Sequence, residues 1–181
     1  ANASVWKQEH PASGHFIVND TEKRGAAWTR QKALDANPFE WTAFLDSDDW
    51  FAPNHLRRLA EVQLETNADY VYSWFWVYND ALGGVLDYDP VFPETHFTDP
   101  WDKNNPRQTT ITVLVRTELA KEVGFWVPNE EEMFPEGRKG EDWYFTLKCN
   151  ELGTVYHFPE RTWYWRHHGN NSSGLPNQGD A

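Results

Sequence analysis

The sequence predicts an α/β fold, because apolar runs of strand length alternate along the chain with segments of helical periodicity. The brief apolar run at residues 40–45 (EWTAFL) is typical of a buried strand, and residues 52–67 repeat apolar side chains at helical spacing. A length of 181 residues suits one domain with a single core. We therefore expect one domain over residues 1–181, with a polar tail from about residue 170.

Four elements are predicted in the first part of the chain. Residues 14–20 (GHFIVND) have the pattern of a short strand, and residues 23–38 have that of a helix, which an Asn-Pro pair ends. Residues 40–45 are expected to form a central buried strand, because the run is bounded by a proline and by aspartates. Pro53 stands near the start of the helix predicted over residues 52–67.

The second part continues the alternation. Residues 68–80 carry the aromatic and β-branched side chains of a strand, and Gly83 with Gly84 indicates a hairpin turn after it. The remaining predicted elements are a strand with a short helix ending at Gly124, a helix that begins with Glu141 and Asp142, and a closing strand region (residues 109–126, 141–153 and 154–169). Residues 89–108 and 127–139 lack periodicity and are expected to be loops that become ordered over a bound ligand.

The charge balance limits the partners of the chain. With 28 Asp and Glu against 16 Lys and Arg, the net charge is -12, so neither a nucleic acid nor an anionic membrane is expected as the main partner. Cys149 is the single cysteine, so no disulfide forms within the chain, as suits a reducing compartment. No apolar run reaches the roughly 20 residues of a transmembrane helix, and no signal-peptide pattern opens the chain. We expect a cytoplasmic location.

Aromatic residues make up 16% of the chain, eleven of them Trp, and cluster in DYVYSWFWVYND and RTWYWRHHG. Such side chains suit the packing of half-buried strands. Platforms that stack against sugar rings have the same composition. Both uses stay open, for different rings.

Three aspartates, Asp46, Asp48 and Asp49, follow the run at residues 40–45, although like charges in contact repel one another. One interpretation is structural, because Asp and Ser cap helices. A calcium loop is disfavoured, because its spacing requires an oxygen ligand where Trp50 stands. The third interpretation is a divalent cation that the carboxylates hold and that binds a diphosphate. Such a cation would offset the repulsion between the aspartates.

Five segments in order resemble one enzyme family. LDSDD matches a Leu-Asp-x-Asp-Asp signature with a DXD motif, and GEDW matches a Glu-Asp motif at a helix start. The other three segments are KRGAAWTRQKAL, ITVLVRTELAKEVGFW and YWRHHGNNSS. Together these motifs, over roughly residues 17–173, resemble the inverting glycosyltransferase family 2. The resemblance implies the GT-A fold, a Rossmann-like α/β fold of nucleotide-diphospho-sugar transferases.

The resemblance also implies an activity. It is that of a metal-dependent inverting glycosyltransferase, hexosyltransferase-like, with Mn²⁺ or Mg²⁺ as cofactor. Such an enzyme moves a sugar from a nucleoside-diphosphate sugar, preferably a UDP-sugar, to a hydroxyl of a saccharide or other acceptor. Two alternatives stay open, which are a non-catalytic sugar- or nucleotide-binding module and a nucleotide-sugar hydrolase.

The resemblance assigns roles to five residues. Asp48 would be a metal ligand, Asp46 would support it from the ribose or the metal side, and His168 would complete the coordination of the metal or the diphosphate. Asp142 would be the general base, and Arg30 would contact the nucleotide. Structural alternatives stay open for each, such as a helix cap for Asp142 and a solvated helix face for Arg30.

One part of the family pattern has no counterpart here. Family members usually begin with strands that end in Pro-Thr-Tyr-Asn and Asp-Asp-Gly-Ser and that hold the nucleobase, and neither motif precedes GHFIVND. We therefore expect a GT-A fold shortened at its N-terminus. Either the chain is a fragment whose N-terminal part was lost or lies on another chain, so that a partner chain or oligomer completes the nucleotide site, or it is a shortened enzyme that binds the nucleotide differently.

Overall fold

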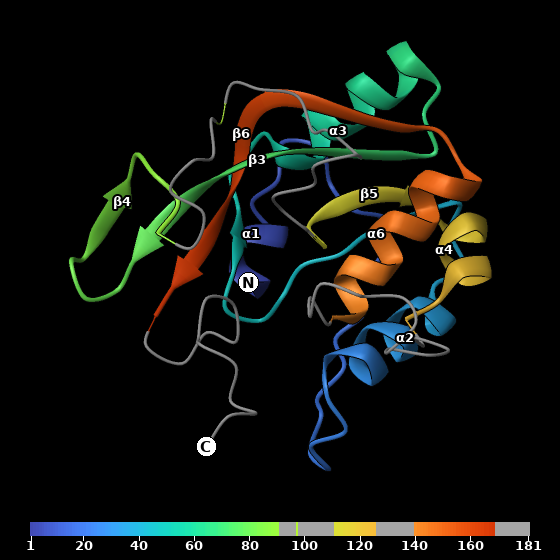
Figure 1. Ribbon diagram of the computed structural model, residues 1–181, viewed down its shortest axis with the longest axis horizontal. Coiled ribbons are helices and arrows are strands. Elements are labelled where there is room, and N and C mark those ends of the chain that lie inside the picture. Colours follow the sequence, from blue (N-terminus) through green and yellow to red (C-terminus); the bar gives the residue numbers. More distant parts are fainter. Residues whose placement is uncertain (91–96, 98–110, 126–139, 169–181) are drawn as a thin grey trace.

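A computed structural model describes residues 1–90, 97, 111–125 and 140–168 (Figure 1). Its helices and strands, in chain order, are α1 (Asn2–Val5), α2 (Ala26–Ala36), β1 (Trp41–Ala43), β2 (Trp50–Phe51), α3 (His55–Thr66), β3 (Tyr70–Asn79), β4 (Gly84–Leu86), β5 (Val113–Arg116), α4 (Thr117–Val123), α6 (Glu141–Leu152) and β6 (Val155–His167). Strands and helices alternate along much of the chain, as the sequence predicts.

The strands form one mixed sheet in the order β1-β5-β3-β6-β2, with β4 paired to β3 outside this path. The long strands β3 and β6 run parallel at its centre, whereas the other pairings are antiparallel. In Figure 1 the hairpin of β3 and β4 projects away from the helices. Gly83 turns this hairpin with a φ of 62°, a conformation that glycine adopts readily.

Helices cover both faces of the sheet. Helices α2, α4 and α6 lie together on one face in Figure 1 and enclose the larger core. That core contains Leu34 of α2, Tyr70 of β3, Val115 of β5 and Phe145 of α6. Helix α3 packs on the opposite face, where Leu59 and Val62 meet strand residues. Because α3 is amphipathic, its Arg and Glu side chains stay at the surface while its apolar stripe is buried.

The sheet brings two distant segments of the chain together. Asp46 to Asp49 form a turn between β1 and β2, closed by a bond from the Asp49 N–H to the Asp46 carbonyl. Strand β2 runs antiparallel to β6, with Trp50 opposite Tyr164. Residues just before β2 therefore lie beside those at the end of β6, which places Asp48 near His168.

Most predicted elements are confirmed, but two predictions are wrong. Residues 14–20 form no strand, because none of the described strands pairs with them. Strand β1 is not central, since within the described residues it stands at one end of the strand order and pairs with β5. Helix α1 and the two-residue strand β2 were not predicted.

Several predictions stay untested. The predicted loops at residues 89–108 and 127–139 and the tail from about residue 170 lie largely or wholly outside the described residues. The single domain over residues 1–181 also stays a prediction. In the described part of the chain, no helix has both the length and the apolar character that crossing a bilayer requires.

Candidate active site

The three clustered aspartates point to three different partners. Asp46 binds Arg30, Asp48 contacts His168, and Asp49 accepts a hydrogen bond from the Arg166 N–H. The repulsion expected from the sequence is therefore reduced by spreading the carboxylates over three contacts. Each contact also ties the turn after β1 to another element.

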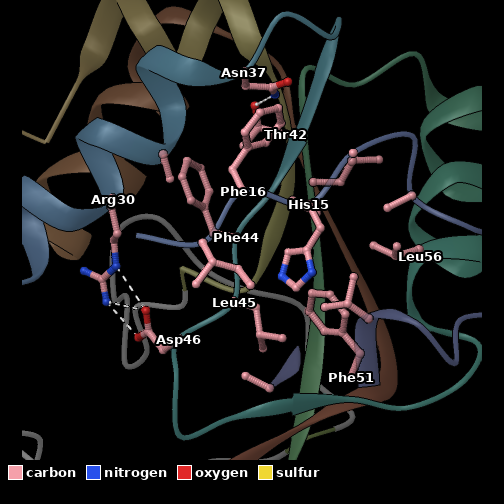
Figure 2. A pocket seen from close by; sticks show the side chains of 18 of the residues that line it. His15, Phe16, Arg30, Asn37, Thr42, Phe44, Leu45, Asp46, Phe51 and Leu56 are labelled. Carbon is pink, nitrogen blue, oxygen red and sulfur yellow. Dashed lines mark hydrogen bonds and ion pairs between the residues drawn. The ribbon is translucent and has the colours of Figure 1, made fainter. Parts of the chain in front are cut away.

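Arg30 joins two acidic segments of the site. Its Nε and Nη2 donate to both carboxylate oxygens of Asp46 at 2.7–3.2 Å, and its Nη1 donates to Glu141 Oε1 at 2.5 Å. Figure 2 shows Arg30 reaching from α2 toward Asp46. The fork of the guanidinium suits such paired carboxylates. Arg30 thus connects α2 with the end of β1 and with the start of α6.

Arg30 does not lie on a solvated helix face, because its side chain is only 12% exposed. Burial disfavours its charge, but the adjacent carboxylates of Asp46, Glu141 and Asp142 outweigh burial and raise the pKa of Arg30. A permanently charged guanidinium is therefore held in the site. Its contacts with Asp46 and Glu141 also engage much of its donor capacity, so contact with a nucleotide would compete with these carboxylates.

Asp142 lies in the first turn of α6, where its surroundings raise its pKa. Burial raises the pKa of Asp142, while the nearby Arg30 charge and the Trp143 N–H act in the opposite direction. A position at the N-terminus of a helix favours the ionised form. Burial is the larger effect, so the carboxylate is more basic than an ordinary Asp, as a proton acceptor requires.

Asp48 and His168 form the second part of the site. His168 Nε2 lies 3.1 Å from Asp48 Oδ2, across 120 residues of sequence. Both side chains are partly exposed. An oxygen and a nitrogen that approach so closely can bind the same cation, because two ligands at about 2.1 Å and 90° are about 3.0 Å apart.

The described residues do not form a complete metal site. Among them, no three His, Cys, Asp or Glu side chains are grouped so that they could hold an ion. Mg²⁺ and Mn²⁺ in phosphate sites often use one or two protein ligands together with phosphate oxygens and water. Asp48 and His168 fit that smaller requirement. Asp46 is less suited to it, because Arg30 engages both of its carboxylate oxygens.

Asp49 is buried and has a structural role. Its Oδ1 accepts the Arg166 N–H at 2.9 Å, which fixes the turn against the end of β6. Burial raises the pKa of Asp49 to about 8, opposed by the Arg166 N–H and reinforced by the charges of Asp46 and Asp48. Asp49 thus positions Asp48 rather than facing the cavity.

An open cavity of about 1570 Å³ lies beside Asp48 and the cluster around Arg30. Arg30, Asp46, Asp48 and Asp142 all line it. Figure 2 shows Arg30 and Asp46 facing one another, with Phe16, Phe44 and Leu45 beyond them. Charged groups and an apolar surface thus share one cavity large enough for a nucleotide sugar.

Two features of this site were missed from the sequence. The sequence assigned no role to Glu141, yet it binds Arg30. The segment at residues 10–20, expected to contain a strand, lines the cavity instead. The motif GEDW indicated a site at the start of α6. It could not show which of its two acidic residues would bind Arg30.

The chain shares this architecture with solved structures of S. aureus TarS. S. aureus TarS 1–349 in complex with UDP is 20% identical with a TM-score of 0.64, over 92% of this chain and 55% of that one. The complex of S. aureus TarS 1–349 with UDP-GlcNAc is 20% identical with a TM-score of 0.60, over 81% of this chain and 40% of that one. The structure described as S. aureus TarS is 20% identical with a TM-score of 0.63, over 91% of this chain and 33% of that one. This chain thus spans between a third and about half of these structures, and the likeness shows the GT-A fold.

A comparison with curated proteins finds no match. The family model described as "Glycosyl transferase family 2" matches residues 6–124. The matched region contains α2, β1 and the three aspartates, and ends at Gly124 after α4. The match spans well over half of the chain, and the fold agrees with it. The chain therefore belongs to glycosyl transferase family 2.

Proposed function

We propose that the chain is part of a metal-dependent, inverting glycosyltransferase that moves a sugar from a nucleoside-diphosphate sugar to an acceptor hydroxyl. The observation that carries this proposal is that Asp142, a half-buried carboxylate with a raised pKa, lines the same cavity as Asp48 and Asp46. Sugar transfer needs a proton acceptor on one side of the sugar and stabilisation of the leaving diphosphate on the other. Asp142 and Asp48 are suited to these two tasks.

Asp48 and His168 would hold Mn²⁺ or Mg²⁺ on the donor side. When bound, the cation supplies positive charge that stabilises the leaving diphosphate. Without it, the carboxylates of Asp46, Asp48 and Asp142 would repel an anionic donor, and Arg30 is already bound to Asp46 and Glu141. Asp46 remains a candidate for the ribose hydroxyls, which can donate hydrogen bonds to it.

Asp142 would accept the proton of the acceptor hydroxyl as that oxygen attacks the anomeric carbon. The hydroxyl oxygen forms the new glycosidic bond, the bond to the diphosphate breaks, and the proton passes to Asp142. A single displacement inverts the anomeric configuration and needs no second nucleophilic carboxylate. The raised pKa of Asp142 supports this role, because it makes proton transfer more favourable than to an ordinary Asp.

UDP is the preferred nucleotide in this proposal. Support comes from the TarS structures, which are described as complexes with UDP and with UDP-GlcNAc. These relatives are only 20% identical to this chain, so the donor sugar is left open. The apolar side chains Phe16 and Leu45 offer a surface for a base beside the charged groups.

The experiment is a thermal-shift screen of nucleoside diphosphates with and without Mn²⁺, followed by turnover of the matching nucleotide sugar with and without acceptors. A ligand that binds only the folded state raises the melting temperature. We expect a shift for UDP that requires the cation, and sugar transfer that requires an acceptor. No shift with any diphosphate would contradict the proposal, and donor cleavage at the same rate without acceptor would identify a hydrolase instead.

A further inference from the structure

The residue before the Glu-Asp pair is a glycine with no conformational reason to be one. Gly140 precedes α6 with φ 172° and ψ 139°, which is extended backbone open to any residue. It provides no side-chain cap for the helix, whereas Ser, Thr, Asp and Asn would. The absence of a side chain at this position therefore needs another explanation.

The explanation lies in the Asp142 carboxylate. A Cβ at position 140 would stand 2.6 Å from Asp142 Oδ1, well inside van der Waals contact. The same oxygen accepts the Trp143 N–H at 2.7 Å. Oδ1 is thus held between the Trp143 N–H and the bare Cα of Gly140. Any side chain at position 140 would push the carboxylate out of this place.

We propose that Gly140 is a positioning residue that leaves space for the Asp142 carboxylate in the orientation in which it accepts the proton. This inference rests on the proposed function, because it assigns Gly140 to the base of that reaction. The Asp142 carboxylate is the flexible end of a side chain, so it can swing away from a new Cβ without disturbing the fold. The effect of a side chain at position 140 therefore falls mainly on catalysis, and the loss of the hydrogen bond from the Trp143 N–H adds a smaller cost in stability.

The test uses Gly140→Ala and Gly140→Ser. A displacement of about 1 Å in a reacting group can reduce the rate by about 10²-fold, so we expect kcat to fall by 10–100-fold. KM for the donor and its affinity by calorimetry should not change. The melting temperature should fall by no more than about 2–4 °C for Ala, which is a poorer N-cap than Gly, and stay or rise for Ser, which is a better one.

Two other glycines provide matched controls. At Gly153, a Cβ would meet Leu119 Cδ2 at 2.6 Å and Asp69 Cβ at 3.3 Å, so Gly153→Ala should lower the melting temperature and leave kcat unchanged. At Gly84 the nearest atom is the Leu82 carbonyl oxygen at 4.0 Å, so Gly84→Ala should change neither quantity. A kcat for both Gly140 variants within threefold of the parent would overturn the proposal.

A double variant separates positioning from a general structural role. If Gly140 acts only through Asp142, then Gly140→Ser should not lower kcat further when Asp142→Asn is already present. Losses of kcat that add up in the double variant would overturn the proposal. Should the parent protein transfer no sugar, the proposed function fails, and the position of the carboxylate is tested by the ¹³Cγ chemical shift of Asp142. A shift that moves in Gly140→Ser but not in Gly84→Ala supports the inference, and an unchanged signal contradicts it.

Discussion

Arg30 Nη1 lies 2.5 Å from Glu141 Oε1, although the two residues are 111 positions apart in the chain. The same guanidinium holds Asp46, so one buried cation joins the turn after β1 to the start of α6. These two segments carry the candidate ligand Asp48 and the candidate base Asp142. The distance between donor side and base side of the site is therefore set largely by Arg30.

Replacing Arg30 should destabilise the protein as well as the site. Arg30→Gln would leave Asp46, Glu141 and Asp142 close together without a compensating charge, and removing one partner of a buried pair costs about 3–5 kcal/mol. Because Asp46 is 36% exposed and Glu141 26%, we expect a smaller loss of about 1–3 kcal/mol. Urea denaturation measures the free energy of unfolding.

Arg57 on α3 is the control for that variant. It binds Glu9 and Glu61 at 2.7 Å, but its side chain is 40% exposed. Exposed ion pairs contribute little to stability because water screens them, so Arg57→Gln should lower the free energy of unfolding less than Arg30→Gln does. Equal losses in the free energy of unfolding for the two variants would show that Arg30 does not hold the turn after β1 to the start of α6.

Acid should destabilise the fold through His55. Burial lowers the pKa of His55 to about 3, opposed by a hydrogen bond with Thr162, whereas the unfolded residue titrates near 6.5. Between these values the unfolded chain binds a proton that the folded chain does not, so stability is complete above pH 6.5 and is lost as the pH falls toward 3. The free energy of unfolding should fall with decreasing pH by up to about 1.4 kcal/mol per pH unit.

His55→Asn should make this slope shallower, because Asn does not titrate and can still reach Thr162 in place of Nδ1. His157, whose pKa burial lowers to about 4, should account for part of the slope that is left. Denaturation curves between pH 3.5 and 7 provide the measurement. The exposed His10 is the control, and the same slope in His55→Asn as in His10→Asn would refute the prediction.

Binding of a nucleoside diphosphate should depend on a cation through Asp48 and His168. We expect Asp48→Ala to abolish the increase in UDP affinity that Mn²⁺ produces, and His168→Ala to weaken it at least tenfold, since each removes a ligand. His167 is the matched control, because it contacts Asn79 instead of Asp48. Calorimetry with Mn²⁺ and with EDTA measures the affinity for UDP. The same Mn²⁺-dependent increase in affinity for His167→Ala and His168→Ala would contradict the prediction.

The sequence predicted the local parts of this site and missed those that depend on distant contacts. The aspartates after residues 40–45 and the Glu-Asp pair at the start of α6 are visible because each is a short motif next to a recognisable element. The contact of Arg30 with Glu141 is not visible, because only the packing of α2 against α6 creates it. No local pattern could show which carboxylates Arg30 would bind.

The same reasoning explains the errors in the fold. Residues 14–20 have the composition of a strand, but a strand also requires a partner, and no described strand pairs with them. Strand β2 has only two residues, Trp50 and Phe51, and exists because β6 runs beside it. Helices α2, α3 and α6 were predicted well, since a helix makes its own backbone hydrogen bonds.

Transfer kinetics of Asp142→Asn test the central claim most directly. We expect the donor affinity and the melting temperature to be kept, because Asn has nearly the same shape, and the transfer rate to fall by about 10²–10⁴-fold, the usual loss when a general base is removed. Glu141→Gln should lose less, since it weakens a contact with Arg30 and leaves the base in place. A transfer rate for Asp142→Asn within a few-fold of the parent, with acceptor present, would contradict the assignment of Asp142 as the base.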